Sequence, residues 1–218
     1  MTLDPDILAD LAVEITPKAY VRVMPMAHAG APLGAGFGVT RFASPTKAFK
    51  VIYLGQDLTT SVAETLVRDR FQGKANRKLL DLEAATWGAT EVSANAPVTL
   101  IDLRTTGLVR LGVSTEAARG KAQGQGRKLS QAIHDQTDAQ GLIYNSRLTG
   151  RPCICVYDRA LPGVLAATPI VEVTRLAGFV DALRELNVTL IATPKARGPA
   201  RQNESPTPSH SGALVGDP

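Results

Sequence analysis

Residues 49–71 read FKVIYLGQDLTTSVAETLVRDRF and predict a strand, a tight turn and a helix. The first apolar run, residues 51–54, is rich in β-branched and aromatic side chains, as buried strands are. Gly55 ends that run, and several polar residues able to cap a helix follow it. Tyr53 is therefore expected near the end of the strand and Glu64 in the first turns of the helix, where both can face one cleft. An aromatic ring and a carboxylate in one cleft suit a ligand with a flat base and a ribose.

A purely structural role explains the same residues. Ser61-Val62-Ala63-Glu64 matches the S-x-x-E capping box, in which Glu64 would accept a hydrogen bond from a free backbone N–H at the helix start. Tyr53 would then be a core tyrosine with a bonded hydroxyl. On either interpretation residues 68–70, Arg-Asp-Arg, can face water. This segment alone leaves both interpretations open.

Length and composition predict one domain, residues 1–193, followed by a disordered tail, residues 194–218, that is rich in Pro, Gly, Ser and charge. The chain is 44% hydrophobic, which is enough for a sizeable core. No apolar run approaches the roughly 18–20 residues that cross a bilayer, and the acidic start MTLDPDILADL is unlike a secretory signal. We therefore expect a cytoplasmic protein without membrane contact. A net charge of +4 is too small to predict nucleic-acid binding.

The two cysteines, Cys153 and Cys155, alternate on one predicted strand. Neighbouring positions on one face of a strand are too far apart for an easy disulfide. The chain has three histidines and none lies near these cysteines in the sequence, so a metal site is not expected. Both thiols are predicted to be small buried side chains.

Periodicity and turn signals divide the rest of the chain into helices and strands. We expect helices over residues 4–15 and 178–186, a turn with a short helix over 105–113, and strands over 19–24, 96–103, 141–146, 153–157, 170–176 and 188–192. The glycine-rich residues 25–38 match neither a Rossmann fingerprint nor a P-loop and are expected to form a loop. Residues 114–135 are polar and helix-compatible, with glycines in their middle and bases at Arg119, Lys121, Arg127 and Lys128. A mobile, solvated face is expected there, with a lid over an anionic ligand as the alternative.

Two arginines lie among apolar residues near the start of the chain. Arg22 belongs to the alternating run of residues 19–24, and Arg41 follows it by 19 residues. Such an arginine is ordinarily at an edge or paired with a carboxylate. If it faces a cleft, its planar guanidinium suits a phosphate group.

Four motifs in one order resemble the RES domain, the toxin half of RES–Xre toxin–antitoxin systems. They are Tyr20-Val21-Arg22, Thr40-Arg41-Phe42, Ile52-Tyr53-Leu54 leading to Ser61-Val62-Ala63-Glu64, and Gly141-Leu142-Ile143-Tyr144-Asn145-Ser146-Arg147. The resemblance covers residues 19–160 and includes the aliphatic strand that follows. Thr40 and Ala43 stand where the family usually has Gly and Asn, whereas Ser146 stands where the family has its serine.

The resemblance implies an α+β fold related to the ADP-ribosyltransferase toxins of the diphtheria-toxin type. Its split, strongly bent mixed β-sheet with flanking helices would surround an NAD cleft. It implies an enzyme that takes NAD⁺ as substrate and breaks the nicotinamide–ribose bond, by hydrolysis or with phosphate as co-substrate, using no bound cofactor. The implied partner is an Xre-type antitoxin that has a helix-turn-helix part and a segment blocking the cleft. A homo-oligomer within that complex is compatible with this picture.

Each motif residue then acquires an implied role. Glu64 would hold the ribose hydroxyls and stabilise the positive charge of an oxocarbenium-like transition state. Tyr53 would hold the nicotinamide ring, Arg22 and Arg41 would bind the pyrophosphate, and Ser146 would orient Glu64 or a ribose hydroxyl.

Two other functions remain open at this level. One is ADP-ribosyl transfer to a protein, which often uses a Glu or Gln two residues before the catalytic glutamate. Val62 stands there, which favours a small acceptor. The other is a non-catalytic NAD or nucleotide-binding module, which would bind NAD and leave it intact.

Overall fold

The computed structural model describes residues 1–161 and 163–194, so nearly all of the predicted tail lies outside the described residues. The helices are α1 (Pro5–Asp10), α2 (Leu58–Val62), α3 (Asp81–Ala84), α4 (Gly107–Arg110), α5 (Glu116–Arg119), α6 (Gly124–Gln136) and α7 (Phe179–Glu185). The strands are β1 (Ala12–Ile15), β2 (Tyr20–Pro25), β3 (Val51–Gly55), β4 (Lys78–Leu80), β5 (Trp87–Ala94), β6 (Val98–Asp102), β7 (Gly141–Asn145), β8 (Pro152–Tyr157), β9 (Leu165–Ala167), β10 (Val171–Glu172) and β11 (Thr189–Ile191).

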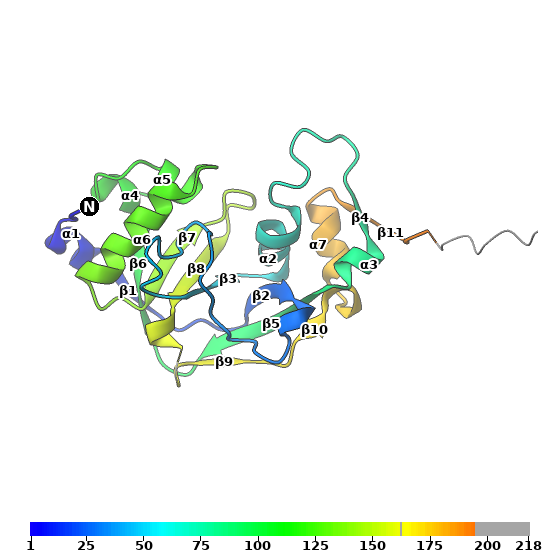
Figure 1. Cartoon of the computed structure of the whole chain (residues 1–218), viewed down its shortest axis with the longest axis horizontal. Coiled ribbons are helices and arrows are strands. Elements are labelled where there is room, and N and C mark those ends of the chain that lie inside the picture. Colours follow the sequence, from blue (N-terminus) through cyan, green and yellow to red (C-terminus); the bar gives the residue numbers. More distant parts are fainter. Residues whose placement is uncertain (162, 195–218) are drawn as a thin grey trace, which may run out of the picture.

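Among the described residues, nine strands form one mixed sheet in the order β1-β6-β7-β8-β3-β2-β5-β10, with β9 also on β5. The pair β6–β7 is parallel and the others are antiparallel. Strands β4 and β11 form a separate parallel pair. Figure 1 shows α4, α5 and α6 gathered over the end of the molecule that holds β6, β7 and β8, and α2 and α7 over the end that holds β2 and β5.

The sheet is nearly divided between β2 and β3. Strand β3 pairs with β8 along its full length and β2 pairs with β5 along its full length, but β2 meets β3 only where Val21 lies opposite Gly55. The two halves of the sheet therefore diverge on one side of that contact. The predicted split α+β sheet with flanking helices is confirmed.

Alternation along the strands builds a core on each face of the sheet. On β3 and β8, the residues Val51, Cys153, Cys155 and Tyr157 pack toward α6, while Ile52, Leu54, Ile154 and Val156 pack on the opposite face. A further cluster joins α2 and α7 to β2 and β5 through Val62, Val23, Ala89, Phe179 and Leu183. The half of the sheet at β3 and the half at β2 thus carry separate helical layers on one face.

The predicted strands at residues 19–24, 51–54, 96–103, 141–146, 153–157 and 188–192 and the helix at 178–186 are confirmed. The single helix predicted over residues 4–15 is wrong, because α1 ends at Asp10 and β1 follows, paired with β6 through Val13 and Ile15 among others. The strand predicted over 170–176 is mostly wrong, since β10 is short and a 3-10 helix, Val173–Arg175, buries Val173.

Residues 114–135 form two helices, as their helix-compatible sequence predicts. The chain breaks between α5 and α6 near the predicted glycines, and both helices bury apolar or small side chains, among them Ala117, Leu129 and Ile133. The expected solvated face is confirmed for Arg119, Lys121 and Lys128, which are exposed, while the opposite side of both helices is packed; the mobility of this face stays a prediction. No helix within residues 1–161 or 163–194 is long and apolar enough to cross a membrane.

Candidate active site

A pocket of about 310 Å³ lies where the two halves of the sheet diverge. Its walls come from β2, β3, the loop around Thr40 and the helical segment that starts with α2. Four of the predicted site residues line it: Arg22, Arg41, Tyr53 and Glu64. A volume of this size falls in the range of small-molecule sites. The structure thus brings together residues that lie up to 42 positions apart in the sequence.

Glu64 reaches this pocket from a π-helical turn, Ala63–Val67, which continues α2. The N-cap of α2 is Asp57, whose carboxylate accepts from the Thr60 N–H at 2.7 Å. Ser61 lies inside the helix and donates its hydroxyl to the Val21 carbonyl at 2.7 Å. The capping-box interpretation of Ser61 and Glu64 is therefore wrong. π-turns within helices often occur at functional sites, and this one carries the Glu64 carboxylate.

Ser146 is the partner of Glu64. Its hydroxyl donates to Glu64 Oε1 at 2.6 Å and accepts from the N–H groups of Leu148 at 3.1 Å and Thr149 at 3.2 Å. A serine hydroxyl has one proton, and the two backbone N–H groups occupy its acceptor side. Because Ser146 is only 3% exposed, water has little access to this arrangement. Ser146 is a fixed donor that orients the carboxylate from behind the pocket wall.

Tyr53 lines the pocket and also holds the neighbouring loop. Its hydroxyl accepts from the Phe42 N–H at 2.9 Å and lies 2.9 Å from Thr40 Oγ1. Burial raises the pKa of Tyr53 well above its ordinary value, so the phenol stays neutral. Tyr53 therefore has the bonded hydroxyl of the structural interpretation and the pocket-facing position of the functional one.

The two predicted arginines are each tied to backbone carbonyls. Arg22 donates to Pro32 O at 2.6 Å and to Gly34 O at 2.8 Å, and burial lowers its pKa to about 10. Arg41, 6% exposed, donates to Gly120 O at 2.6 Å. Burial lowers the pKa of Arg41, and the nearby positive charge of Arg68 adds to this effect. Both side chains remain cationic at neutral pH. They hold the loops of the pocket wall through these bonds, and they give that wall positive charge.

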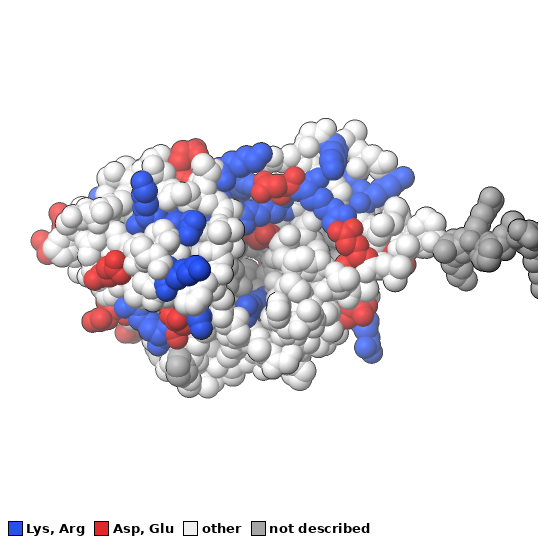
Figure 2. Space-filling view, in the orientation of Figure 1, with Lys and Arg blue, Asp and Glu red and all other residues white. Residues whose placement is uncertain are grey.

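Arg68 is a pocket residue that the sequence motifs did not indicate. It lines the pocket, and its side chain is 21% exposed, so it is in partial contact with water and faces the pocket as well. The available signal was its spacing, because residues four apart lie on one face of a helix and Arg68 follows Glu64 by four. Nearby, Arg147 pairs with Asp69 at 2.8 Å. Figure 2 shows Lys and Arg side chains gathered along the upper side of the central hollow.

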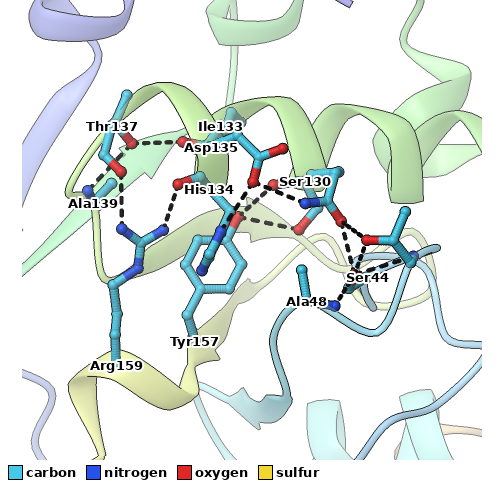
Figure 3. A network of polar contacts seen from close by, with 12 residues as sticks. Ser44, Ala48, Ser130, Ile133, His134, Asp135, Thr137, Ala139, Tyr157 and Arg159 are labelled. Carbon is cyan, nitrogen blue, oxygen red and sulfur yellow. Dashed lines mark hydrogen bonds and ion pairs between the residues drawn. The ribbon is translucent and has the colours of Figure 1, made fainter.

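The loop that carries Arg41 is fastened to α6. Ser130 donates to Phe42 O at 2.8 Å and lies 3.1 Å from the Tyr157 hydroxyl, while Ser44 donates to Gln131 at 2.7 Å. Figure 3 shows Ser44, Ser130 and Tyr157 within the polar contacts along α6, with the Tyr157 side chain extending from the sheet toward the helix. Arg127 adds bonds to the carbonyls of Ala43 and Ser44. This base therefore serves the scaffold rather than a mobile lid.

The two thiols are buried, free and unreactive. Burial raises the pKa of Cys153 to about 12 and raises that of Cys155 as well. Cys153 lines the pocket, but at neutral pH a thiol with such a pKa is protonated and a poor nucleophile. In the described part of the chain, no group of three or more His, Cys, Asp or Glu side chains could hold a metal ion.

The pocket therefore combines one oriented carboxylate, two tyrosines that burial keeps neutral, Tyr53 and Tyr144, and several fixed cations. A carboxylate of this kind can stabilise developing positive charge, and the cations can bind an anionic substrate. Such a set of groups suits a phosphate-bearing ligand that becomes cationic at its reacting carbon.

Comparisons with known proteins identify the family of the chain. The RES domain family matches residues 12–177, which contain all five predicted site residues. A protein of Sinorhizobium fredii (strain NBRC 101917 / NGR234) named "Probable toxin y4kH" is 34% identical over 98 residues, covering 43% of this chain and 75% of that protein.

A solved structure, the M. tuberculosis MbcT-MbcA toxin-antitoxin complex, contains a chain that matches 77% of this chain and is itself covered to 90%, with a TM-score of 0.60 and 16% identity. This second likeness is one of fold, and the fold is ADP-ribosyltransferase-like, as predicted. Because the family match spans well over half of the residues, the chain belongs to the RES domain family.

Proposed function

We propose that this protein is the toxin of a toxin–antitoxin pair and that it breaks the nicotinamide–ribose bond of NAD⁺. The single observation that carries the reaction is the 2.6 Å bond from Ser146 to Glu64 at the wall of a cation-lined pocket. The toxin role is supported by the name of the Sinorhizobium relative and by the toxin–antitoxin complex that shares the fold.

Glu64 would carry the central chemical role. Loss of nicotinamide leaves a ribose with oxocarbenium character, whose positive charge a nearby carboxylate stabilises. Ser146 would keep that carboxylate in one orientation, so that the charge interaction strengthens as the bond breaks and needs no reorganisation. Nicotinamide leaves as a neutral molecule, so the reaction requires no general acid, and the hydroxyl of Tyr53 is already bonded to the Thr40–Phe42 loop.

Tyr53 and the arginines would bind the substrate around the scissile bond. The Tyr53 ring would confine the nicotinamide, while Arg22, Arg41 and Arg68 would neutralise the pyrophosphate. A water molecule or a phosphate ion would then attack the ribose from the open side. The positive charge of Arg68 lies close enough to lower the pKa of Arg41, so the pocket wall holds two neighbouring cations that could bind a second anion.

Transfer of ADP-ribose to a protein is the rival reaction. Its transferases often aim the acceptor with a side chain two residues before the catalytic glutamate. Here that residue is Val62, the last residue of α2. Its side chain is fully buried in the core and cannot reach an acceptor protein. This burial favours a small acceptor.

The proposed partner is an Xre-type antitoxin whose segment blocks the pocket, and the proposed location is the cytoplasm. The Lys and Arg side chains along the upper side of the hollow would favour an acidic blocking segment. Co-purification with the neighbouring antitoxin protein, followed by loss of NAD cleavage on its addition, tests this part of the proposal.

The reaction is tested by incubating purified protein with NAD⁺, with and without phosphate, and identifying the products. Nicotinamide with ADP-ribose indicates hydrolysis, and nicotinamide with ADP-ribose-1″-phosphate indicates phosphorolysis. Bound but intact NAD⁺ would contradict the proposed cleavage and favour a nucleotide-binding module. Labelled ADP-ribose on a protein would favour transfer.

A further inference from the structure

The pocket has two ends that differ in chemistry. At one end β2 meets β3 at Val21 and Gly55, beneath Ser61 of α2. Four residues further along β2, a distance of roughly 13 Å at about 3.3 Å per residue, Pro25 lies opposite Trp87 of β5. Both Pro25 and Trp87 line the pocket. Trp87 therefore lies at the wide end of the divergence, far from the β2–β3 contact.

The carboxylate belongs to the narrow end. Glu64 is three residues beyond Ser61 on the same helical segment, and Ser146 lies beside the β8 residues that pair with the end of β3. Arg22 lies between the two ends, one residue from Val21. The order along the pocket is thus carboxylate, guanidinium and aromatic ring.

Trp87 has the properties of a ligand-binding ring. Its side chain is half-buried, its inner part packs against the cluster around Val23 and Ala89, and its neighbours on the pocket wall are the apolar Met24 and Pro25. None of the hydrogen bonds between residues 1–161 and 163–194 involves its indole N–H. A flat, rigid ring supported from behind and open in front suits stacking on another flat ring.

We infer that Trp87 is the platform on which the adenine base of the substrate stacks. The inference rests on the proposed function, since it assumes that Glu64 acts at the nicotinamide ribose. If the nicotinamide ribose lies at the narrow end and the pyrophosphate lies at the arginines, the adenine base lies at the wide end, because adenine is the base remote from the bond that breaks. Trp87 is then a specificity residue that distinguishes a dinucleotide from a mononucleotide.

A fluorescence titration tests the contact directly, because Trp87 is the only tryptophan of the chain. The Glu64→Gln variant is titrated with ADP, with pyrophosphate and with nicotinamide, and tryptophan emission is recorded. ADP should quench or shift the emission, whereas pyrophosphate and nicotinamide should not. Saturable binding of ADP without any change in emission overturns the inference, and so does an equal response to nicotinamide.

Kinetics with two substrates provide the second test. Nicotinamide mononucleotide has the scissile bond but lacks the adenosine half. Trp87→Leu should raise the KM for NAD⁺ roughly tenfold, as loss of one base–aromatic stack does, with little change in kcat and none in cleavage of the mononucleotide. Trp87→Phe, which keeps a flat ring, should recover most of the affinity. Equal effects on both substrates would assign Trp87 to the nicotinamide end or to the scaffold alone.

The two proposals can fail separately. If wild-type protein leaves NAD⁺ intact while ADP alters Trp87 emission, the adenine site stands and the cleavage reaction falls. If NAD⁺ is cleaved but neither the emission nor the ratio of the two substrates depends on Trp87, the reaction stands and the adenine site falls. If the mononucleotide is not cleaved at all, the emission titration alone decides.

Discussion

Ser146 and Glu64 lie 82 positions apart in the sequence, and the serine hydroxyl donates to the glutamate carboxylate at 2.6 Å. The serine follows β7 and the glutamate lies in the π-turn after α2, so the pair joins the two halves of the molecule behind the pocket wall. Since backbone N–H groups occupy the acceptor side of the hydroxyl, its proton is directed to Glu64. We therefore treat Ser146 as a positioning residue that acts through Glu64.

Ser146→Ala should lower kcat for NAD⁺ cleavage by roughly tenfold to a hundredfold, the value of a hydrogen bond to a charged group, with a smaller effect on KM. Steady-state kinetics at saturating NAD⁺ measure this. In a Glu64→Gln background the same substitution should add little, because the two residues act as a unit. Additive losses in the double variant would show that Ser146 contacts the substrate independently of Glu64.

Arg68→Gln should raise the KM for NAD⁺ severalfold, because it removes a cation from the pocket wall. Arg70→Gln is the matched control, since Arg70 lies on the same segment but pairs with Glu83. Isothermal titration of the Glu64→Gln background with NAD⁺ compares the two affinities at low and moderate salt. Similar affinities for the two variants would exclude Arg68 from substrate binding.

Gly126→Ala should destabilise the protein by about 1–3 kcal/mol, the usual cost of forcing an extra methyl group into a packed site. A β-carbon at Gly126 would lie 2.5 Å from Ala117 O and 2.7 Å from Arg41 O, so α6 packs against the Arg41 loop only because this residue is glycine. Gly124→Ala is the control, because a β-carbon there meets nothing within 4 Å. Urea unfolding of both variants measures the difference in their free energies of unfolding. Equal stability would show that the Arg41 loop can move to accommodate the added methyl group.

Stability should fall at alkaline pH, in part because of Cys153. Burial raises the pKa of Cys153 from 9.0 to about 12, so the folded state keeps a proton that the unfolded state loses. The stabilisation from this group is complete below pH 9 and is lost as pH rises toward 12, at up to about 1.4 kcal/mol per pH unit. Thermal unfolding between pH 7 and 11 should show a shallower decline for Cys153→Ala than for wild type. Parallel curves would contradict this assignment.

The strand–turn–helix of residues 49–71 was predictable because its signals are local. The apolar run, Gly55 and the caps are adjacent in the sequence, and β3, Asp57 and α2 appear where these signals place them. The edge strand β1 was missed because a four-residue strand directly after a helix continues the helical pattern of apolar residues. Strand β5 was missed for another reason. Gly88 and the polar Thr90 and Glu91 interrupt the apolar pattern of a strand, and the strand is formed by backbone pairing with β2, which is distant in the sequence.

The residues of the site were predictable from the sequence motifs, but the hydrogen bonds that hold those residues in place were not. The order of Arg22, Arg41, Tyr53, Glu64 and Ser146 indicated the pocket, and four of the five line it while Ser146 lies behind one of them. The contacts of Arg22 with the loop carbonyls, of Tyr53 with Phe42 and of Ser130 with the Arg41 loop depend on chain folding over long sequence distances. Arg68 and Trp87 belong to no sequence motif. They were identified as pocket residues only from the positions of the α2 segment and β5 beside the gap between β2 and β3.

The central claim is that Glu64 is the catalytic carboxylate of an NAD⁺-cleaving enzyme. The most direct measurement is a time course of nicotinamide release from NAD⁺ by wild-type protein and by Glu64→Gln, with circular dichroism to confirm that both are folded. We predict release by the wild type and a loss of at least about a thousandfold in the variant, as expected when a charge-stabilising group is removed. Unchanged release by a folded Glu64→Gln protein, or no release by the wild type, would contradict the claim.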